Sequence, residues 1–259
     1  MGVLDSFRLN GRTAMVTGGS RGLGRAMAGA LAEAGADLIL VGRDQAQLLV
    51  TQRELLRLGR TVEIVVADVA IPDGAANACD EALALGQPID ILLNNVGGRR
   101  ADVATEDVTV EQWAGYLDLN LTSALVCCQK LGNPMLQRGR GSIINITSIA
   151  GPIAIRGIGG RHYETAKAAL AALTRSLAAD WAGRGVRVNA IAPGVFATGP
   201  NQKWFAEKPE FEQSFLGRIP MERFGRPAEL GPAAVFLASD ASSYVTGATL
   251  VVDGGFTLW

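Results

Sequence analysis

Short runs of β-branched and aliphatic residues alternate with longer helix-forming stretches along most of this 259-residue chain. Such an alternation of continuous apolar strands with helices is typical of a parallel sheet that is covered on both faces. It predicts an α/β fold: a single, doubly wound domain over residues 1–259 with a seven-stranded parallel sheet and helices on both faces. The expected strands are Thr13–Val16, Asp37–Val41, Val62–Val66, Ile89–Leu93, Ser142–Ile146, Val186–Ile191 and Thr249–Val252.

Helical spacing is clearest in the Ala- and Leu-rich stretches Arg25–Ala34, Gln45–Leu58 and Ala166–Trp181. Residues 199–217 depart from the alternation, because they carry aromatic side chains among charged ones. We expect one or two short amphipathic helices there. They would form either a cap on the core or a small substrate lid over a cleft.

The first expected strand runs into a glycine-rich turn, Thr17-Gly18-Gly19-Ser20-Arg21-Gly22-Leu23-Gly24, and a helix follows. Gly18, Gly22 and Gly24 allow a tight turn, close approach of a pyrophosphate and close packing of helix on strand. The N–H groups and dipole of the helix N-terminus favour phosphate. The spacing is Gly-x-x-x-Gly-x-Gly, which differs from the more common Gly-x-Gly-x-x-Gly. A purely structural turn is the alternative, but the flanking strand and helix favour a dinucleotide site in a Rossmann fold.

The end of the second expected strand bears on the choice of cofactor. An acid there would hydrogen-bond the ribose 2′-OH of NAD, but the sequence reads Val41-Gly42-Arg43-Asp44. Arg43, together with Arg21, could bind the 2′-phosphate of NADP through charge-assisted hydrogen bonds. Asp44 is a competing ribose ligand, although its spacing to Gln47 suits a helix cap. We therefore favour NADP(H), with NAD(H) as the alternative.

Composition argues against several other classes of protein. The net charge of -1 lacks the basic footprint of a nucleic-acid-binding protein, and no basic run suggests membrane attraction. No basic N-terminal region precedes an apolar stretch, so we expect no signal peptide. Three cysteines, two of them adjacent, favour a reducing compartment, and we expect the cytoplasm. A lone histidine, His162, and unclustered cysteines argue against a catalytic metal.

Tyr163 and Lys167 are four positions apart in a helical stretch and therefore share one face. A tyrosine, with a pKa of ~10, is a poor base at neutral pH, and lowering that pKa to ~7 requires ~4 kcal/mol. A partly desolvated lysine and a cationic oxidised nicotinamide could supply this stabilisation. Such a pair is weak support by itself, because most Tyr-x-x-x-Lys pairs are exposed neighbours.

Further motifs accompany this pair, and with them the chain resembles the short-chain dehydrogenase/reductase family over nearly its whole length. They are Thr17–Gly24, Asp68-Val69, Asn94-Asn95-Val96-Gly97, Asn120, Ser148, Tyr163-Glu164-Thr165-Ala166-Lys167, and Pro193-Gly194 with Thr198. The resemblance implies an oxidoreductase that interconverts an alcohol and a ketone by hydride transfer.

The same resemblance implies a role for each matched residue. Tyr163 would transfer the substrate proton, Ser148 would hold the reacting oxygen, Lys167 would bind the nicotinamide ribose, and Asn120 would support a water chain. The remaining residues would contact the cofactor: Gly18, Ser20, Arg21, Gly22, Leu23, Gly24, Arg43, Asp68, Val69, Asn95, Gly97, Pro193, Gly194 and Thr198. The family also implies a homotetramer or homodimer, assembled through helices around Val110–Gln137 and Tyr163–Trp181.

The sequence departs from the family pattern between Ser148 and Tyr163, which are 15 positions apart, about two more than is usual. The glycine-containing stretch Gly151–Gly160 can absorb the extra residues as a loop and would reshape the substrate pocket.

The substrate is less constrained than the chemistry, because the fold does not fix function. The C-terminal third, from Phe215-Leu216-Gly217-Arg218 through Val252-Asp253-Gly254-Gly255, and Arg99-Arg100 resemble the gluconate 5-dehydrogenase branch, which implies a sugar acid or polyol. Arg99 and Arg100 at the pocket mouth could attract a carboxylate; two solvated charges on a loop are the alternative. The alternatives are reduction of a 3-oxoacyl thioester and, in another class, a non-catalytic nucleotide sensor.

Overall fold

The computed structural model describes residues 2–98, 103–155 and 159–258. Seven strands form one all-parallel sheet in the order β3-β2-β1-β4-β5-β6-β7. This is the doubly wound sheet that the sequence predicts, and the α/β fold is confirmed. The strands are β1 (Thr13–Thr17), β2 (Asp37–Gly42), β3 (Val62–Val66), β4 (Ile91–Asn94), β5 (Gly141–Ile146), β6 (Val186–Pro193) and β7 (Thr249–Val252).

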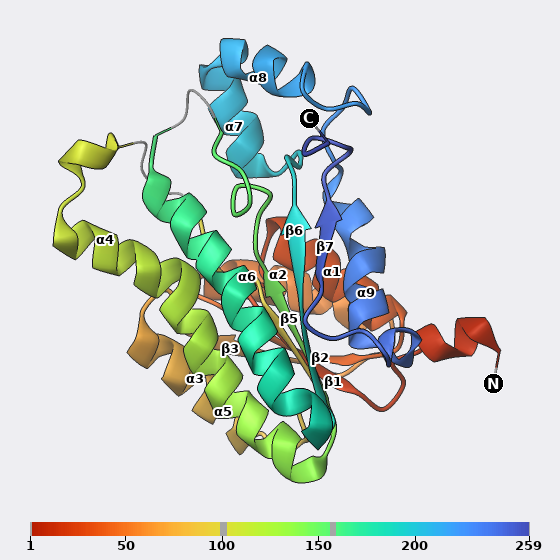
Figure 1. The fold of residues 1–259 in the computed structure, drawn as a ribbon. Helices are drawn as coiled ribbons and strands as arrows, with labels where there is room; N and C mark the ends of the chain where they lie inside the picture. The colour runs from red at the N-terminus through yellow and green to blue at the C-terminus, as the bar shows by residue number, and fades with distance from the viewer. Residues whose placement is uncertain (1, 99–102, 156–158, 259) are drawn as a thin grey trace.

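Helices cover both faces of the sheet (Figure 1). One apolar core lies between the sheet and α1 (Gly22–Glu33), α2 (Gln45–Leu56) and α9 (Gly231–Ala238). A second core lies between the opposite face and α3 (Pro72–Ala84), α5 (Ser123–Arg138) and α6 (Arg161–Trp181). Because the central strands are buried on both sides, apolar residues follow one another along them, as at Ala14–Val16 and Ile91–Leu93, rather than at alternate positions only.

The main differences from the expected bounds lie at the starts of three elements. Helix α1 begins at Gly22 rather than Arg25, because the glycine-rich turn itself forms the first helical turn. Helix α6 begins at Arg161 rather than Ala166, directly after Gly160 in a left-handed conformation (φ 76°). Strand β4 begins at Ile91 rather than Ile89.

Two helices lie beyond the carboxyl ends of β6 and β7, namely α7 (Gly199–Glu207) and α8 (Pro209–Leu216) (Figure 1). A third apolar cluster joins them to the loop after β5 and to the C-terminal segment. Tyr163 and Trp204 pack against this cluster, so the two helices lie beside the expected catalytic tyrosine. The cluster consists of Ile149, Ala150, Ile155, Phe205, Phe215, Ile219 and Phe256.

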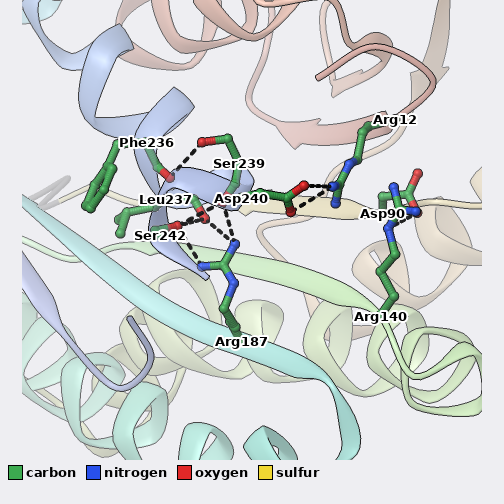
Figure 2. Close-up of polar contacts among 9 residues, drawn as sticks. All are labelled: Arg12, Asp90, Arg140, Arg187, Phe236, Leu237, Ser239, Asp240 and Ser242. Carbon is green, nitrogen blue, oxygen red and sulfur yellow. Dashed lines mark hydrogen bonds and ion pairs between the residues drawn. The ribbon is translucent and has the colours of Figure 1, made fainter. Parts of the chain in front are cut away.

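Arg187 on β6 connects the sheet to the segment that follows α9 (Figure 2). Its Nη2 donates to the carbonyls of Leu237 at 3.0 Å and Ser239 at 3.1 Å. Its Nη1 donates to the hydroxyl of Ser242 at 2.8 Å. Burial lowers the pKa of the Arg187 guanidinium. The guanidinium adds charge-assisted hydrogen bonds to carbonyls at the end of α9 that also accept from the hydroxyl of Ser242.

Within the described ranges, no helix is both long enough and apolar enough to cross a bilayer. The same residues contain no group of three or more His, Cys, Asp or Glu side chains suited to hold a metal ion.

Candidate active site

The glycine-rich turn has the backbone conformation that its sequence predicts. Gly18 and Gly22 have positive φ values of 66° and 57°, which are strained for any residue with a Cβ. A Cβ on Gly24 would overlap the Gly18 carbonyl, so α1 packs directly against the turn. A Cβ on Gly22 would meet only the Thr198 Cγ2 atom, at 3.9 Å. The open backbone at Gly22, at the N-terminus of α1, fits the approach of a pyrophosphate.

Asn95 supports this turn from the end of β4. Its Nδ2 donates to the carbonyls of Thr17 at 3.1 Å and Gly18 at 3.3 Å, and its backbone N–H donates to Thr17 Oγ1 at 2.9 Å. Asn95 therefore shapes the turn from the protein side. Its partner is Thr17 Oγ1, a hydroxyl for which the sequence predicted no separate role.

The other residues of the turn differ in exposure. Ser20 is buried, and its carbonyl accepts a hydrogen bond from the Thr51 hydroxyl at 3.0 Å. Arg21 is exposed at the N-cap of α1, and Leu23 is half-buried against the core. Only Arg21 has a charged side chain free to extend over the surface of the turn.

Arg43 and Asp68 meet across the carboxyl ends of β2 and β3. Arg43 Nη1 lies 3.3 Å from Asp68 Oδ2, and the two side chains are 55% and 40% exposed. The other Asp68 oxygen accepts from the backbone N–H of Ala70 at 3.0 Å. The side chain of Val69 is buried in the core, so only its backbone can border a ligand.

Asp44 caps α2, as the alternative reading of its spacing predicts. Its carboxylate accepts from the Gln47 backbone N–H at 3.0 Å. This contact favours the capping role over a role in ribose binding.

Tyr163 and Lys167 lie in the first two turns of α6, and the lysine is fully buried. Its Nζ donates to the Ile146 carbonyl at 2.8 Å and lies 5.9 Å from the centroid of the Tyr163 ring. Burial lowers the pKa of Lys167 to about 8. Ser148 lies two residues past β5, where its Oγ accepts from the Ala150 N–H at 3.1 Å. The amine is thus desolvated and placed near the tyrosine, as an electrostatic role requires.

Asn120 lies in a π-helical turn, Asp118–Thr122, between α4 (Val110–Leu117) and α5. Its Oδ1 accepts from the Gly98 N–H at 2.9 Å, and its Nδ2 donates to the carbonyls of Gly98 and Tyr116 at 3.1 and 3.0 Å. Single-turn π-bulges are frequent at functional sites.

Gly97 separates Asn120 from Lys167. A Cβ on this glycine would lie 2.9 Å from Asn120 Oδ1 and 2.8 Å from Lys167 Nζ. The two polar groups therefore approach the same stretch of backbone, and only glycine leaves them room.

The segment after β6 completes the site. The Pro193 carbonyl accepts from the Ile149 N–H at 3.2 Å, and the Gly194 N–H donates to the Val252 carbonyl at 2.9 Å. Thr198 is the N-cap of α7 and approaches Gly22 of the glycine-rich turn. The structure thus brings the expected residues from eight separate segments to the carboxyl edge of the sheet, where α/β folds bind ligands.

The contacts on either side of Tyr163 were not predicted from the sequence. Arg161 and Glu164 form an ion pair, and the buried ring of His162 stacks on Tyr116 with centroids 3.5 Å apart. Opposite charges three positions apart were the available signal for the ion pair. Arg99 and Arg100, expected at the pocket mouth, lie outside the described residues.

The geometry is that of a dinucleotide-binding sheet with a tyrosine–lysine pair at its carboxyl edge. Residues 18–257 match a family model described as "Enoyl-(Acyl carrier protein) reductase". The chain is 43% identical to galactitol 2-dehydrogenase (L-tagatose-forming) of Cereibacter sphaeroides over 98% of both chains. It is 41% identical to 2-dehydro-3-deoxy-D-gluconate 5-dehydrogenase of Bacillus subtilis over 99% of both.

A solved structure from Beutenbergia cavernae, a candidate NAD(P)-dependent gluconate 5-dehydrogenase with bound NADP, is also similar. It superposes with a TM-score of 0.91 at 40% identity, covering 98% of this chain and 100% of that one. Fold, motifs and relatives together define an NAD(P)-dependent oxidoreductase. The chain belongs to the short-chain dehydrogenase/reductase family, as the resemblance implied.

Proposed function

We propose that this enzyme interconverts a secondary alcohol and a ketone at the carbon next to the terminal hydroxymethyl group of an open-chain polyol or sugar acid. The names of the relatives carry this proposal. C2 of galactitol and C5 of a gluconate are both the carbinol beside a terminal CH2OH, because gluconates are numbered from the carboxyl end. The relatives therefore share the reacting group although their substrates differ in charge at the far end.

In the direction of oxidation, Tyr163 Oη accepts the hydroxyl proton while the carbinol C–H bond breaks. The oxidised nicotinamide, when bound, supplies the acceptor for the hydride. Ser148 holds the reacting oxygen, and the Lys167 ammonium stabilises negative charge on Tyr163. Asn120, fixed by Gly98, supports the water chain through which the proton leaves. In reduction, the proton moves from Tyr163 to the carbonyl oxygen.

We infer a preference for NADP, since Arg43 and Arg21 supply positive charge beside the expected 2′-phosphate. Asp44, the acid that could instead bind the ribose of NAD, already caps α2 through its carboxylate. Separate titrations of NADPH and NADH, followed by nicotinamide fluorescence, test this preference. Tight NADPH binding that Arg43→Ala abolishes supports it. A preference for NADH that the substitution leaves unchanged would overturn it.

Galactitol and gluconate with NADP, and acetoacetyl thioester with NADPH, form the panel that tests the substrate. Turnover of galactitol or gluconate with low activity on the thioester supports the proposal. The reverse pattern would establish a 3-oxoacyl-thioester reductase. Cofactor binding without turnover of any member would favour a nucleotide sensor.

The position of α7 and α8, beside Tyr163 and over the carboxyl ends of the strands, supports a role as the substrate lid. We also infer a homotetramer or homodimer assembled through the long α4–α5 and α6 helices, which light scattering after size exclusion would test.

A further inference from the structure

Arg161 and Glu164 lie on either side of Tyr163 in the first turn of α6. Arg161 Nη1 contacts both carboxylate oxygens of Glu164, at 2.8 and 2.7 Å. The Glu164 side chain is only 9% exposed, whereas that of Arg161 is 38% exposed. A carboxylate buried to this degree is costly unless it is paired and hydrogen-bonded.

Both side chains also bind one residue of the loop between Ser148 and Tyr163. The Ile155 N–H donates to Glu164 Oε1 at 3.3 Å, and the Ile155 carbonyl accepts from Arg161 Nη1 at 3.3 Å. The ion pair thereby satisfies both polar backbone groups of Ile155. These hydrogen bonds fix the loop relative to the helical turn that carries Tyr163.

Ile155 belongs to the apolar cluster beneath α7 and α8. Its side chain is 7% exposed and packs in the same cluster as Ile149 and Phe205, against which Tyr163 also packs. Moving the Ile155 backbone would therefore move an apolar wall beside Tyr163. This wall lies in the stretch where the chain has more residues than its family usually has.

We propose that the Arg161–Glu164 pair positions the substrate-facing wall of the active site by holding Ile155. The pair acts through Ile155 and does not contact the reacting atoms, so both members are positioning residues. The inference rests on the proposed function in one respect, namely that substrate binds beside Tyr163 beneath α7 and α8. The charges of Arg161 and Glu164, on either side of Tyr163, thus contribute to substrate affinity.

Glu164→Gln tests the pair while keeping an oxygen that can accept from Ile155. We expect KM for the polyol or sugar acid to rise about tenfold with kcat nearly unchanged, since a charge-assisted hydrogen bond is lost. NADPH affinity should not change. Arg161→Met should behave alike, and the double variant should be no worse than either single one, because one unit has been broken.

Glu54→Gln is the matched control, because it breaks another arginine–glutamate pair, with Arg25, between α1 and α2. It should leave KM unchanged. A fall in thermal stability in Glu164→Gln with an unchanged KM would assign the pair a purely structural role and overturn the proposal. Additive effects of the two single substitutions on KM would also overturn it.

Hydrogen exchange at the Ile155 amide gives a readout that needs no substrate. The amide should exchange about tenfold faster in Glu164→Gln than in the wild type, because its acceptor is weakened. If the wild type turns over no sugar acid or polyol, the proposed function fails. This measurement still shows whether the Arg161–Glu164 pair holds the Ile155 backbone. Equal exchange rates in both proteins would show that the pair does not hold Ile155.

Discussion

Replacing the buried lysine of the site should change the pH dependence of stability in a direction that the structure dictates. Burial lowers the pKa of Lys167 from 10.5 to about 8. In the unfolded chain the amine stays protonated up to its ordinary pKa, so between these values the unfolded state binds more protons than the native state. The free energy of unfolding of the wild type therefore rises with pH across this window.

Lys167→Met removes this titration, and the two stability curves should diverge as pH rises. A tenfold change in proton affinity is worth ~1.4 kcal/mol, so the full effect is about 3 kcal/mol. About 2 kcal/mol of it should develop between pH ~7 and pH ~9.5 in favour of the wild type. Urea unfolding followed by far-UV circular dichroism measures the difference.

The exposed Lys203 supplies a matched control. Lys203→Met also removes a lysine, but without burial, and its stability relative to the wild type should stay constant with pH. If Lys167→Met also ran parallel to the wild type, the amine would not be desolvated in the native state. The electrostatic account of Tyr163 would then lose its basis.

Three further substitutions have defined outcomes. Gly97→Ala should lower kcat by about a hundredfold while NADPH still binds in a fluorescence titration. The new Cβ would lie 2.8 Å from Lys167 Nζ and 2.9 Å from Asn120 Oδ1 and would displace both. Unchanged turnover would refute the positions of these two side chains in the site. Arg187→Met should lower the free energy of unfolding by about 2 kcal/mol without altering KM, because the charge-assisted hydrogen bonds to the Leu237 and Ser239 carbonyls are lost, and urea denaturation would measure it. Gly42→Asp should raise the ratio of kcat/KM for NAD over NADP, because it adds an acid at the end of β2 where a Cβ would have ordinary contacts, 3.5 Å from Ser20 Oγ.

The sheet was predictable from the sequence because its strands are short runs rich in β-branched and aliphatic residues, bounded by turn residues. Val62–Val66 and Thr249–Val252 have the predicted bounds. The glycine-rich turn was also predictable, since positive φ at Gly18 and Gly22 restricts the residue type. The start of α1 was not, because the glycines that allow the turn disfavour a helix.

The polar contacts that organise the site were less predictable, because they join side chains to distant backbone groups. The Lys167 amine binds the Ile146 carbonyl, and Asn120 reaches Gly98 from a π-helical turn. No local pattern specifies either contact. The Arg161–Glu164 spacing was visible, but its connection to Ile155 depends on the path of the intervening loop.

We have proposed that Tyr163 transfers the substrate proton in an oxidoreductase that acts beside a terminal hydroxymethyl group. The most direct test is NADP-linked oxidation of galactitol and gluconate by the wild type and by Tyr163→Phe, with NADPH affinity measured in parallel. We expect both proteins to bind NADPH equally and only the wild type to oxidise substrate, with kcat at least ~100-fold higher, because general acid–base catalysis contributes this much or more. Equal turnover by the phenylalanine variant would show that Tyr163 does not transfer the proton.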